Sequence, residues 1–253
     1  MARPRMASPF LTAEWRDLAM LNYEVDPAIL SSFVPAATEV DSWNGKTLVS
    51  IVGFRFLRTR VLGLPIPFHR DFDEVNLRLY VRRKASDSWR RGVVFIKEIV
   101  PKAAIAWVAR TVYNENYVAL PMCHDIIASH GSVAGRVTYK WRDRDRWSSL
   151  TASIRGAPTL PDQDSEATFI TEHYWGYARQ ADGSSLEYQV EHPRWRVWQG
   201  IDAALECDVA SLYGPAFAGF LAGRPSSVFV ADGSPVEVHR GAAIRNVSGR
   251  GHR

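Results

Sequence analysis

The chain has 253 residues, of which 46% are hydrophobic and 23% charged, and its formal net charge is +4. Such a chain is long and apolar enough to bury a core without disulfide bonds. Its two cysteines exclude a disulfide framework or a cysteine-based metal knuckle, and they favour a reducing, cytoplasmic compartment. No apolar run approaches the ~20 residues needed to span a bilayer, so we expect no membrane partner.

The basic excess comes from arginines spread along the chain and at its ends. This charge would permit contact with nucleic acid, but the sequence has no zinc-finger, helix-turn-helix or RNA-recognition signature. We therefore expect no nucleic-acid partner.

The first part of the chain predicts strands separated by one short helix. Residues 16–25 and 46–56 are rich in apolar, β-branched and aromatic side chains, which predicts two strands, with a bulge at Gly53. Asp26 followed by Pro27 predicts an N-cap and the first turn of a helix.

Residues 72–83, FDEVNLRLYVRR, are the most informative segment. Alternation places their apolar side chains on one face of a strand and Glu74, Asn76, Arg78 and Tyr80 on the other. An acid, an amide, a guanidinium and a phenol in a row suit a ligand pocket, although a solvent-exposed strand face is the alternative. Glu74 is therefore the first site candidate.

The segment after this strand predicts a hairpin and a helix. Residues 93–100 follow a turn and predict the antiparallel partner of the strand. Residues 101–113 are rich in alanine and apolar nearly all round, which predicts a buried helix. Arg110 near its end then needs an acid or several carbonyl groups around it, because a guanidinium keeps its charge when buried.

The second half of the chain is dominated by strand patterns. Four strands are predicted, at residues 136–142, 147–155, 167–177 and 186–192. A helix is predicted over residues 213–222, and Asp232 followed by Gly233 predicts the turn of a final hairpin.

Strands that follow strands, with only two or three helices, indicate an α+β fold of mainly antiparallel sheet, strongly curved or closed into a barrel. We expect one domain over residues 10–240, a disordered tail at 1–9 and a disordered basic tail at 241–253.

Several classes of site lack their signatures. The seven histidines show neither HxH nor HExxH spacing, so no metal site is predicted. There is no glycine-rich phosphate loop, GxSxG motif or recognised cysteine motif, so no cofactor and no covalent serine or cysteine chemistry are predicted. His192 shares the parity of Tyr188 and Val190 and could point inward, but a hydrogen-bonded structural histidine is the expected state.

Taken together, six segments resemble the proteins grouped as domain of unknown function 2071, in the acetoacetate decarboxylase-like superfamily. They are EWRDLAMLNYEVDPAILSSFVP, FDEVNLRLYV, ARTVYNENYVALPM, VTYKWR, FITEHYWGY and EHPRW. The resemblance spans about residues 10–238 and implies a curved antiparallel sheet around a central, mostly closed cavity. In true acetoacetate decarboxylases a lysine forms a Schiff base with the keto acid, and a second lysine, an arginine and a glutamate complete the site.

The resemblance implies that Arg16 matches the family arginine and Glu74 the glutamate, while Arg110 aligns with a further arginine. The lysine pair does not carry over, because Tyr117 and Val118 stand in its place and have no amine. We therefore do not expect an active acetoacetate decarboxylase.

We expect a small-molecule cavity that binds or acts on a small organic acid or carbonyl compound without Schiff-base chemistry. Glu74 is expected to act as general acid or base, and Tyr117 to donate a hydrogen bond where the lysine acts in the family. Five residues are expected to bind substrate: Arg16, Asn76, Arg78, Arg110 and Tyr113.

Other interpretations stay open. The same cavity would serve a non-catalytic metabolite-binding or sensing protein, so the sequence does not decide whether the chain is an enzyme. Alternatively, Glu74 and Arg110 would form only a buried ion pair that holds the helix to the sheet. A further alternative is a structural or interaction domain whose cavity is filled by side chains. An exposed strand edge would allow a homo-oligomer.

Overall fold

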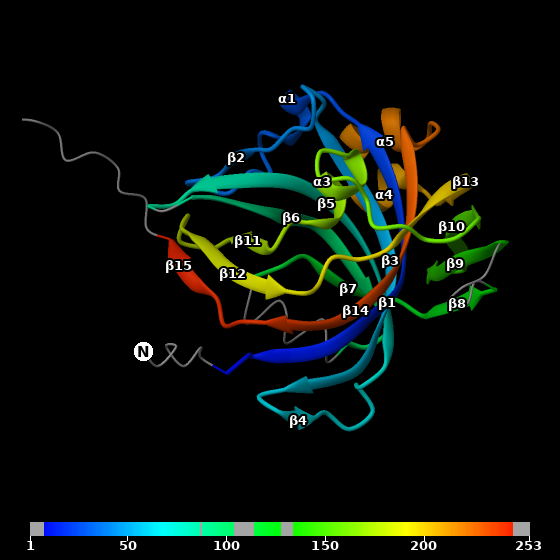
Figure 1. Cartoon of the computed structure of the whole chain (residues 1–253), viewed down its shortest axis with the longest axis horizontal. Helices are drawn as coiled ribbons and strands as arrows, with labels where there is room; N and C mark the ends of the chain where they lie inside the picture. The colour runs from blue at the N-terminus through cyan, green and yellow to red at the C-terminus, as the bar shows by residue number, and fades with distance from the viewer. Residues whose placement is uncertain (1–7, 87, 104–113, 128–133, 245–253) are drawn as a thin grey trace, which may run out of the picture.

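A strongly curved sheet organises the chain in the computed structural model, which describes residues 8–86, 88–103, 114–127 and 134–244 (Figure 1). The strands are β1 (Leu11–Glu24), β2 (Glu39–Val40), β3 (Leu48–Val61), β4 (Leu64–Pro65), β5 (Phe72–Lys84), β6 (Trp89–Val100), β7 (Tyr117–Ala119), β8 (Met122–Ile126), β9 (Ala134–Asp143), β10 (Arg146–Arg155), β11 (Trp175–Arg179), β12 (Ser185–Glu191), β13 (Val197–Glu206), β14 (Ser227–Val238) and β15 (Ala242–Ile244). The helices are α1 (Pro27–Leu30), α3 (Glu166–Thr171), α4 (Val209–Tyr213) and α5 (Pro215–Leu221).

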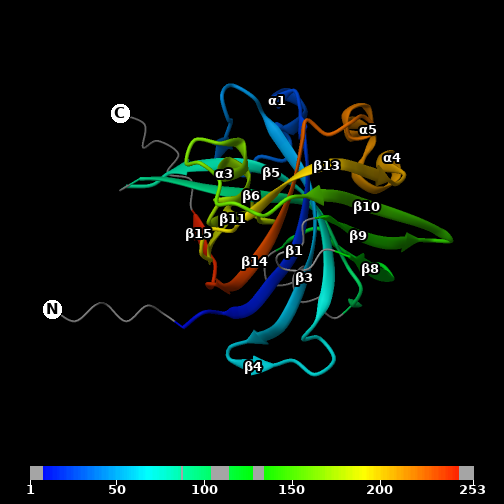
Figure 2. The same cartoon turned by 45° about the vertical axis from the view of Figure 1, so that its right-hand side comes forward.

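The strand order is β15-β12-β11-β6-β5-β3-β1-β14-β13-β10-β9-β8, and nearly all pairs are antiparallel. An additional pairing of β12 with β14 joins two distant parts of this order, so the strands between them form a ring. Figures 1 and 2 show these strands curving around one another, with α4 and α5 outside the ring. The expected α+β class, with a mainly antiparallel and curved sheet, is confirmed.

The ring has an apolar layer on each side, and β5 belongs to both. Its odd-numbered side chains, such as Val75 and Leu77, are fully buried in an outer cluster with Tyr139, Trp141 and Phe217 from the outlying strands and α5. Even-numbered side chains face an inner cluster that includes aromatic residues of β1, β3 and β14. The alternation predicted for residues 72–83 is therefore present, and its polar face points into the ring rather than into solvent.

Most predicted elements are confirmed, with small shifts at their ends. The strand predicted at residues 16–25 begins at Leu11, and the hairpin of β5 and β6 is antiparallel as expected. Asp26 is the N-cap of α1, because its carboxylate accepts a hydrogen bond from the Ala28 amide. Residues 104–113, which hold most of the predicted buried helix, lie outside the described residues. The sheet continues past residue 240, since β15 pairs with β12.

One strand of the second half was predicted wrongly. Residues 167–177 begin as a helix, α3. The Ser165 hydroxyl accepts a hydrogen bond from the Thr168 amide, and this N-cap favours a helix more strongly than the β-branched side chains favour a strand. The helix predicted over residues 213–222 is confirmed as α5, which begins at Pro215, and a break at Gly214, with φ of 104°, separates it from α4.

The predicted turn at Asp232 and Gly233 is also wrong, because β14 continues through these residues without reversing. Gly233 has a φ of 79° and pairs with Arg16 of β1, and Asp17 beside it has a φ of 57°. Both strands bend here without reversing, since each contains a residue in the left-handed region. The bulge predicted at Gly53 lies instead in β1, where the register with β3 shifts between Arg16 and Ala19.

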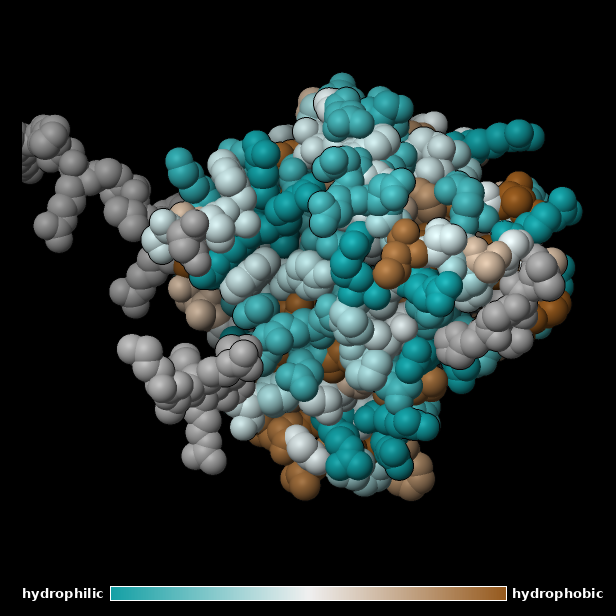
Figure 3. Space-filling view, in the orientation of Figure 1, coloured by the Kyte–Doolittle hydropathy of each residue, from teal (hydrophilic) through white to brown (hydrophobic). Residues whose placement is uncertain are grey.

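The hairpin between β3 and β4 extends from the body of the molecule, and brown apolar atoms gather at this edge of the surface (Figure 3). Leu62, Leu64 and Phe68 are exposed here, and Phe68 is 88% exposed. Every helix among the described residues is too short or too polar to cross a membrane.

Gly53 leaves the space that the Tyr139 ring occupies, and we predict that Gly53→Ala destabilises the fold. A methyl group there would overlap the ring, which is fully buried and tied by its hydroxyl to the Asp17 carbonyl oxygen at 2.9 Å. The free energy of unfolding should fall by about 1–3 kcal/mol in urea titrations. Gly219→Ala in α5 is the matched control, because no atom lies within 4 Å, and it should stabilise by about 0.5–1 kcal/mol. Equal effects of the two substitutions would contradict the packing argument.

Candidate functional site

A cavity of about 250 Å³ lies inside the ring. One wall is aromatic and is built by Trp15, Phe54, Phe56, Phe72, Phe95 and Trp195. Trp15 packs edge-on against Phe54 and Phe56, at ring-centroid distances of 5.3 and 5.7 Å. This wall offers apolar surface to a ligand, and no side chain of the described residues fills the space.

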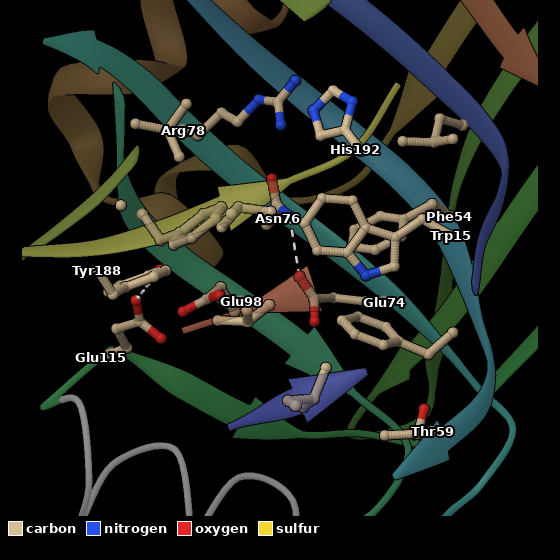
Figure 4. Close-up of a pocket in the computed structure, with 18 of the residues that line it drawn as sticks. Trp15, Phe54, Thr59, Glu74, Asn76, Arg78, Glu98, Glu115, Tyr188 and His192 are labelled. Carbon is tan, nitrogen blue, oxygen red and sulfur yellow. Dashed lines mark hydrogen bonds between the residues drawn. The ribbon is translucent and has the colours of Figure 1, made fainter. Parts of the chain in front are cut away.

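The polar wall comes from the inward face of β5. Glu74, Asn76 and Arg78 all line the cavity and are 2%, 1% and 9% exposed. Figure 4 shows Asn76 between the two charged side chains, with Arg78 toward His192 and Glu74 toward Glu98. Tyr80, the fourth polar residue of this face, instead hydrogen-bonds through its hydroxyl to Ser50 at 2.6 Å and is not among the lining residues.

Three carboxyl groups meet at one end of the cavity: Glu74 of β5, Glu98 of β6 and Glu115 just before β7 (Figure 4). Glu98 pairs directly with Asn76 across the sheet. Asn76 Nδ2 donates to Glu74 Oε1 at 2.9 Å, and the Tyr117 hydroxyl donates to Glu74 Oε2 at 3.4 Å. These glutamates form the carboxyl cluster, and a further donor, the Tyr188 hydroxyl, reaches Glu115 Oε1 at 2.7 Å.

Burial is the main reason that the carboxyl cluster holds protons near neutral pH. It raises the pKa of Glu74 to about 7 and that of Glu115 to about 8. Burial, followed by the charges of Glu115 and Glu74, raises the pKa of Glu98 well above its usual range. Three carboxylates cannot all ionise this close together in a desolvated site.

Arg78 is a buried cation that forms no ion pair among the described residues, although its charge acts on Glu74 and its guanidinium lies 5.7 Å from the centre of the Tyr80 ring. Its Nη2 lies 3.5 Å from the Ile170 carbonyl oxygen and 4.0 Å from Met20 Sδ, both weak contacts. Its Nε has no hydrogen-bond partner at all in the described part of the chain. An unpaired buried guanidinium is energetically unfavourable, which distinguishes Arg78 from the ion-paired arginines of the chain.

Two histidines complete the cavity wall. His192 stacks on Trp195 at 4.1 Å, and its Nδ1 bonds to the Pro193 carbonyl oxygen at 2.9 Å. Burial lowers the pKa of His192, so the ring is neutral and its Nε2 accepts hydrogen bonds. His173 Nε2 lies 3.3 Å from Asp41, and burial lowers the pKa of His173 to about 4, which leaves it neutral as well.

Unsatisfied polar atoms concentrate at this cavity. Among the described residues, six lining side chains carry a buried polar atom without a hydrogen-bond partner: Trp15 Nε1, Thr59 Oγ1, Asn76 Oδ1, Arg78 Nε, Glu98 Oε2 and His173 Nδ1. Buried polar groups are nearly always paired, so this concentration of unpaired polar atoms sets the cavity wall apart from an ordinary protein core.

The structure brings together four of the residues proposed from sequence: Glu74, Asn76, Arg78 and Tyr117. Arg16, the expected partner of Glu74, lies outside the cavity and bonds to Glu14 at 2.9 Å. The reason is strand alternation, since Trp15 beside it points inward.

Two more predicted site residues, Arg110 and Tyr113, lie outside the described residues. The ion pair considered between Glu74 and Arg110 therefore falls outside the described part of the chain too, because Arg110 does.

Sequence analysis missed Glu98 and Glu115. Glu98 interrupts the apolar run VVFIKEIV, and an acid inside a buried strand is the signal that would have identified it. His192 is hydrogen-bonded, as expected, and also lines the cavity. Among the described residues no lysine lines the cavity, and Lys97 beside Glu98 pairs with the outward-facing Leu77.

A family model matches residues 12–235 of the chain. The family is domain of unknown function 2071, described as an uncharacterized conserved protein. The chain is also 28% identical over 182 residues to the uncharacterized protein YqjF of Bacillus subtilis (strain 168), a match that covers 71% of this chain and 72% of YqjF.

The fold is similar to several solved structures. An acetoacetate decarboxylase-like enzyme from Sphingomonas wittichii RW1 has a TM-score of 0.67 at 11% identity, over 97% of each chain. The enduracididine biosynthesis enzyme MppR, complexed with pyruvate, has a TM-score of 0.67 at 14% identity, over 97% of this chain and 95% of its own. Acetoacetate decarboxylase from Legionella pneumophila subsp. pneumophila str. Philadelphia 1 has a TM-score of 0.63 at 14% identity, over 98% and 94%. At these identities the likeness shows a common fold.

We predict that stability falls as the pH rises through neutrality, and that Glu74→Gln weakens this fall. A pKa raised from 4.5 to about 7 means that the folded protein binds more protons than the unfolded chain between these values. The protonated Glu74 side chain therefore adds about 3 kcal/mol to the free energy of unfolding below about pH 4.5, and this stabilisation is lost by about pH 7. Urea unfolding at a series of pH values measures the slope. The exposed Glu24→Gln is the control, and a slope unchanged by Glu74→Gln would contradict the assignment.

Proposed function

The chain belongs to the family of domain of unknown function 2071, and we propose that its cavity binds a small organic acid with a second carbonyl group, without Schiff-base chemistry. The observation that carries this proposal is the unpaired, buried guanidinium of Arg78 in the same cavity as the carboxyl cluster. The similar enzyme MppR is complexed with pyruvate, which supports an oxo acid as the class of ligand.

Arg78 is the proposed carboxylate site. Its guanidinium offers planar, paired donors that match a carboxylate, and a carboxylate would neutralise a charge that the described residues leave unpaired. The aromatic wall beside it, with Trp15 and Phe54, would bury the apolar part of the ligand.

The carboxyl cluster is the proposed site for the carbonyl group. Glu74, with a pKa of about 7, is present in both protonation states near neutral pH, which suits a general acid or base. Tyr117 stays protonated, because burial raises its pKa, and its hydroxyl donates to Glu74 Oε2 and also interacts with Glu98. Proton transfer at a carbonyl or at the carbon beside it is the chemistry that these groups support.

We predict that Arg78→Met abolishes most of the affinity for oxo acids. Loss of a charged, buried hydrogen-bonding partner should weaken binding by about 1.5–3 kcal/mol in calorimetric titrations with levulinate and its longer straight-chain homologues. Arg82→Met is the matched control, because Arg82 lies on the same strand but is paired with Glu39 outside the cavity. Arg16→Met tests the role expected from sequence, and its outward position predicts unchanged affinity. Equal losses in all three variants would contradict an anion site at Arg78.

We predict that no covalent imine forms with these acids. Borohydride treatment in their presence should leave the intact mass of the protein unchanged, because Tyr117 has no amine. Product analysis of the same mixtures then separates the two classes of function. Turnover without a borohydride adduct would indicate acid/base catalysis, whereas binding without turnover would indicate a binding or sensing protein. A borohydride-trapped adduct would overturn the exclusion of imine chemistry.

A further inference from the structure

Glu98 occupies the centre of the carboxyl cluster and is its most isolated member. It is 1% exposed, and its Oε2 has no hydrogen-bond partner among the described residues. Asn76 donates to Glu74 and Tyr188 donates to Glu115, whereas the Tyr117 hydroxyl, the donor beside Glu98, is shared with Glu74. A donated hydrogen bond favours the ionised form of a carboxyl group, so Glu74 and Glu115 are better suited to carry charge than Glu98.

The groups that face Glu98 reinforce this difference. Glu74 approaches from β5 and Glu115 from the segment before β7, and both raise the pKa of Glu98 when ionised. The Tyr117 hydroxyl is shared between Glu98 and Glu74, so Glu98 does not have that donor to itself. Arg78 lies on the far side of Asn76 in the same cavity (Figure 4). A proton shared by the three carboxyls is therefore best placed on Glu98.

We propose that Glu98 is the proton-bearing carboxyl of the cavity and that its Oε2 donates a hydrogen bond to the carbonyl oxygen of the ligand. The cavity then selects a neutral oxygen acceptor at this end and a carboxylate at Arg78. This inference rests on the proposed function and adds the group that recognises the carbonyl. Glu98 lines the cavity on the strand directly opposite Asn76, so a ligand that extends along β5 from Arg78 would pass beside the Glu98 side chain.

The competing ligand is an amino acid, whose ammonium group would seek ionised carboxylates instead. The affinities for amino acids and for oxo acids are expected to change in opposite directions as the pH rises. An ammonium ligand would bind more tightly as the cluster ionises, whereas a carbonyl ligand loses its donor as Glu98 gives up its proton.

The test compares levulinate and its longer straight-chain homologues with the amino acids in which an ammonium replaces the ketone oxygen. Calorimetric titrations of the full chain are carried out from about pH 6 to about pH 9, where the carboxylate of the probes stays ionised. The variants are Glu98→Gln, whose amide donates a hydrogen bond at every pH, and Glu98→Met, which has no donor. Glu237→Gln, outside the cavity, is the control.

We expect wild-type protein to bind the oxo acids, to lose affinity as the pH rises, and to reject the amino acids. Glu98→Met should weaken binding about tenfold, the loss of one hydrogen bond to a buried group. Glu98→Gln should restore wild-type affinity at low pH and weaken the pH dependence, a rescue that a purely structural role would not produce. This second variant keeps the test decisive if Glu98→Met folds poorly.

The outcomes separate the two proposals. If wild-type protein binds none of the oxo acids, the proposed function fails. If it binds them but both Glu98 variants match the wild type in affinity and pH dependence, only the role of Glu98 is overturned. Tighter binding of the amino acids, with affinity that rises with pH, would overturn the assignment of a neutral acceptor.

Discussion

Burial of β5 on both faces is the constraint on which the rest of the structure depends. The outward side chains of this strand, such as Leu77, are fully buried against the outlying strands, and the inward ones line the cavity. A strand buried on one side usually turns its polar face to water. Closure of the ring by β12 and β14, through only two residue pairs, removes that option and encloses Glu74, Asn76 and Arg78.

Desolvation then sets the electrostatics of the site. Arg78 keeps its charge without a carboxylate partner among the described residues, while the carboxyls beyond Asn76 respond by holding protons. Glu74 and Arg78 carry opposite charges when Glu74 is ionised, but they lie four residues apart on β5. Because side chains on one face of a strand are spaced by about 7 Å for each second residue, the two groups do not meet. The cavity therefore has a cationic side chain, Arg78, at one end and the carboxyl cluster at the other, with an aromatic wall between them.

The fold is common to enzymes with acetoacetate decarboxylase-like structures, but a fold does not fix the chemistry of its cavity. Here Tyr117 points into the cavity at one of the positions where the resemblance would place a lysine, and Val118 packs against the outer cluster. Tyr117 offers a phenol whose proton is directed to Glu74, and our proposal of acid/base rather than imine chemistry rests on this arrangement.

The sequence by itself determined the local features of this protein. The alternation of residues 72–83, the N-cap at Asp26 and the absence of an amine at Tyr117 are properties of short segments, and period and side-chain chemistry express them directly. Two predictions from local patterns were wrong. The N-cap at Ser165 produced a helix where β-branched residues predicted a strand, and at Gly233 the strand bent where a turn was predicted.

Only the tertiary structure decided which side chains share the cavity. Arg16 faces outward because Trp15 beside it points inward and the bulge of β1 follows, a matter of strand pairing that alternation in one segment cannot fix. Glu98 and Glu115 join Glu74 through pairings of β5, β6 and β7 across the sheet. The pKa values of Glu98 and Glu115 are raised because the three carboxyl groups are buried close together. Both desolvation and like charge depend on neighbours that are distant in the sequence.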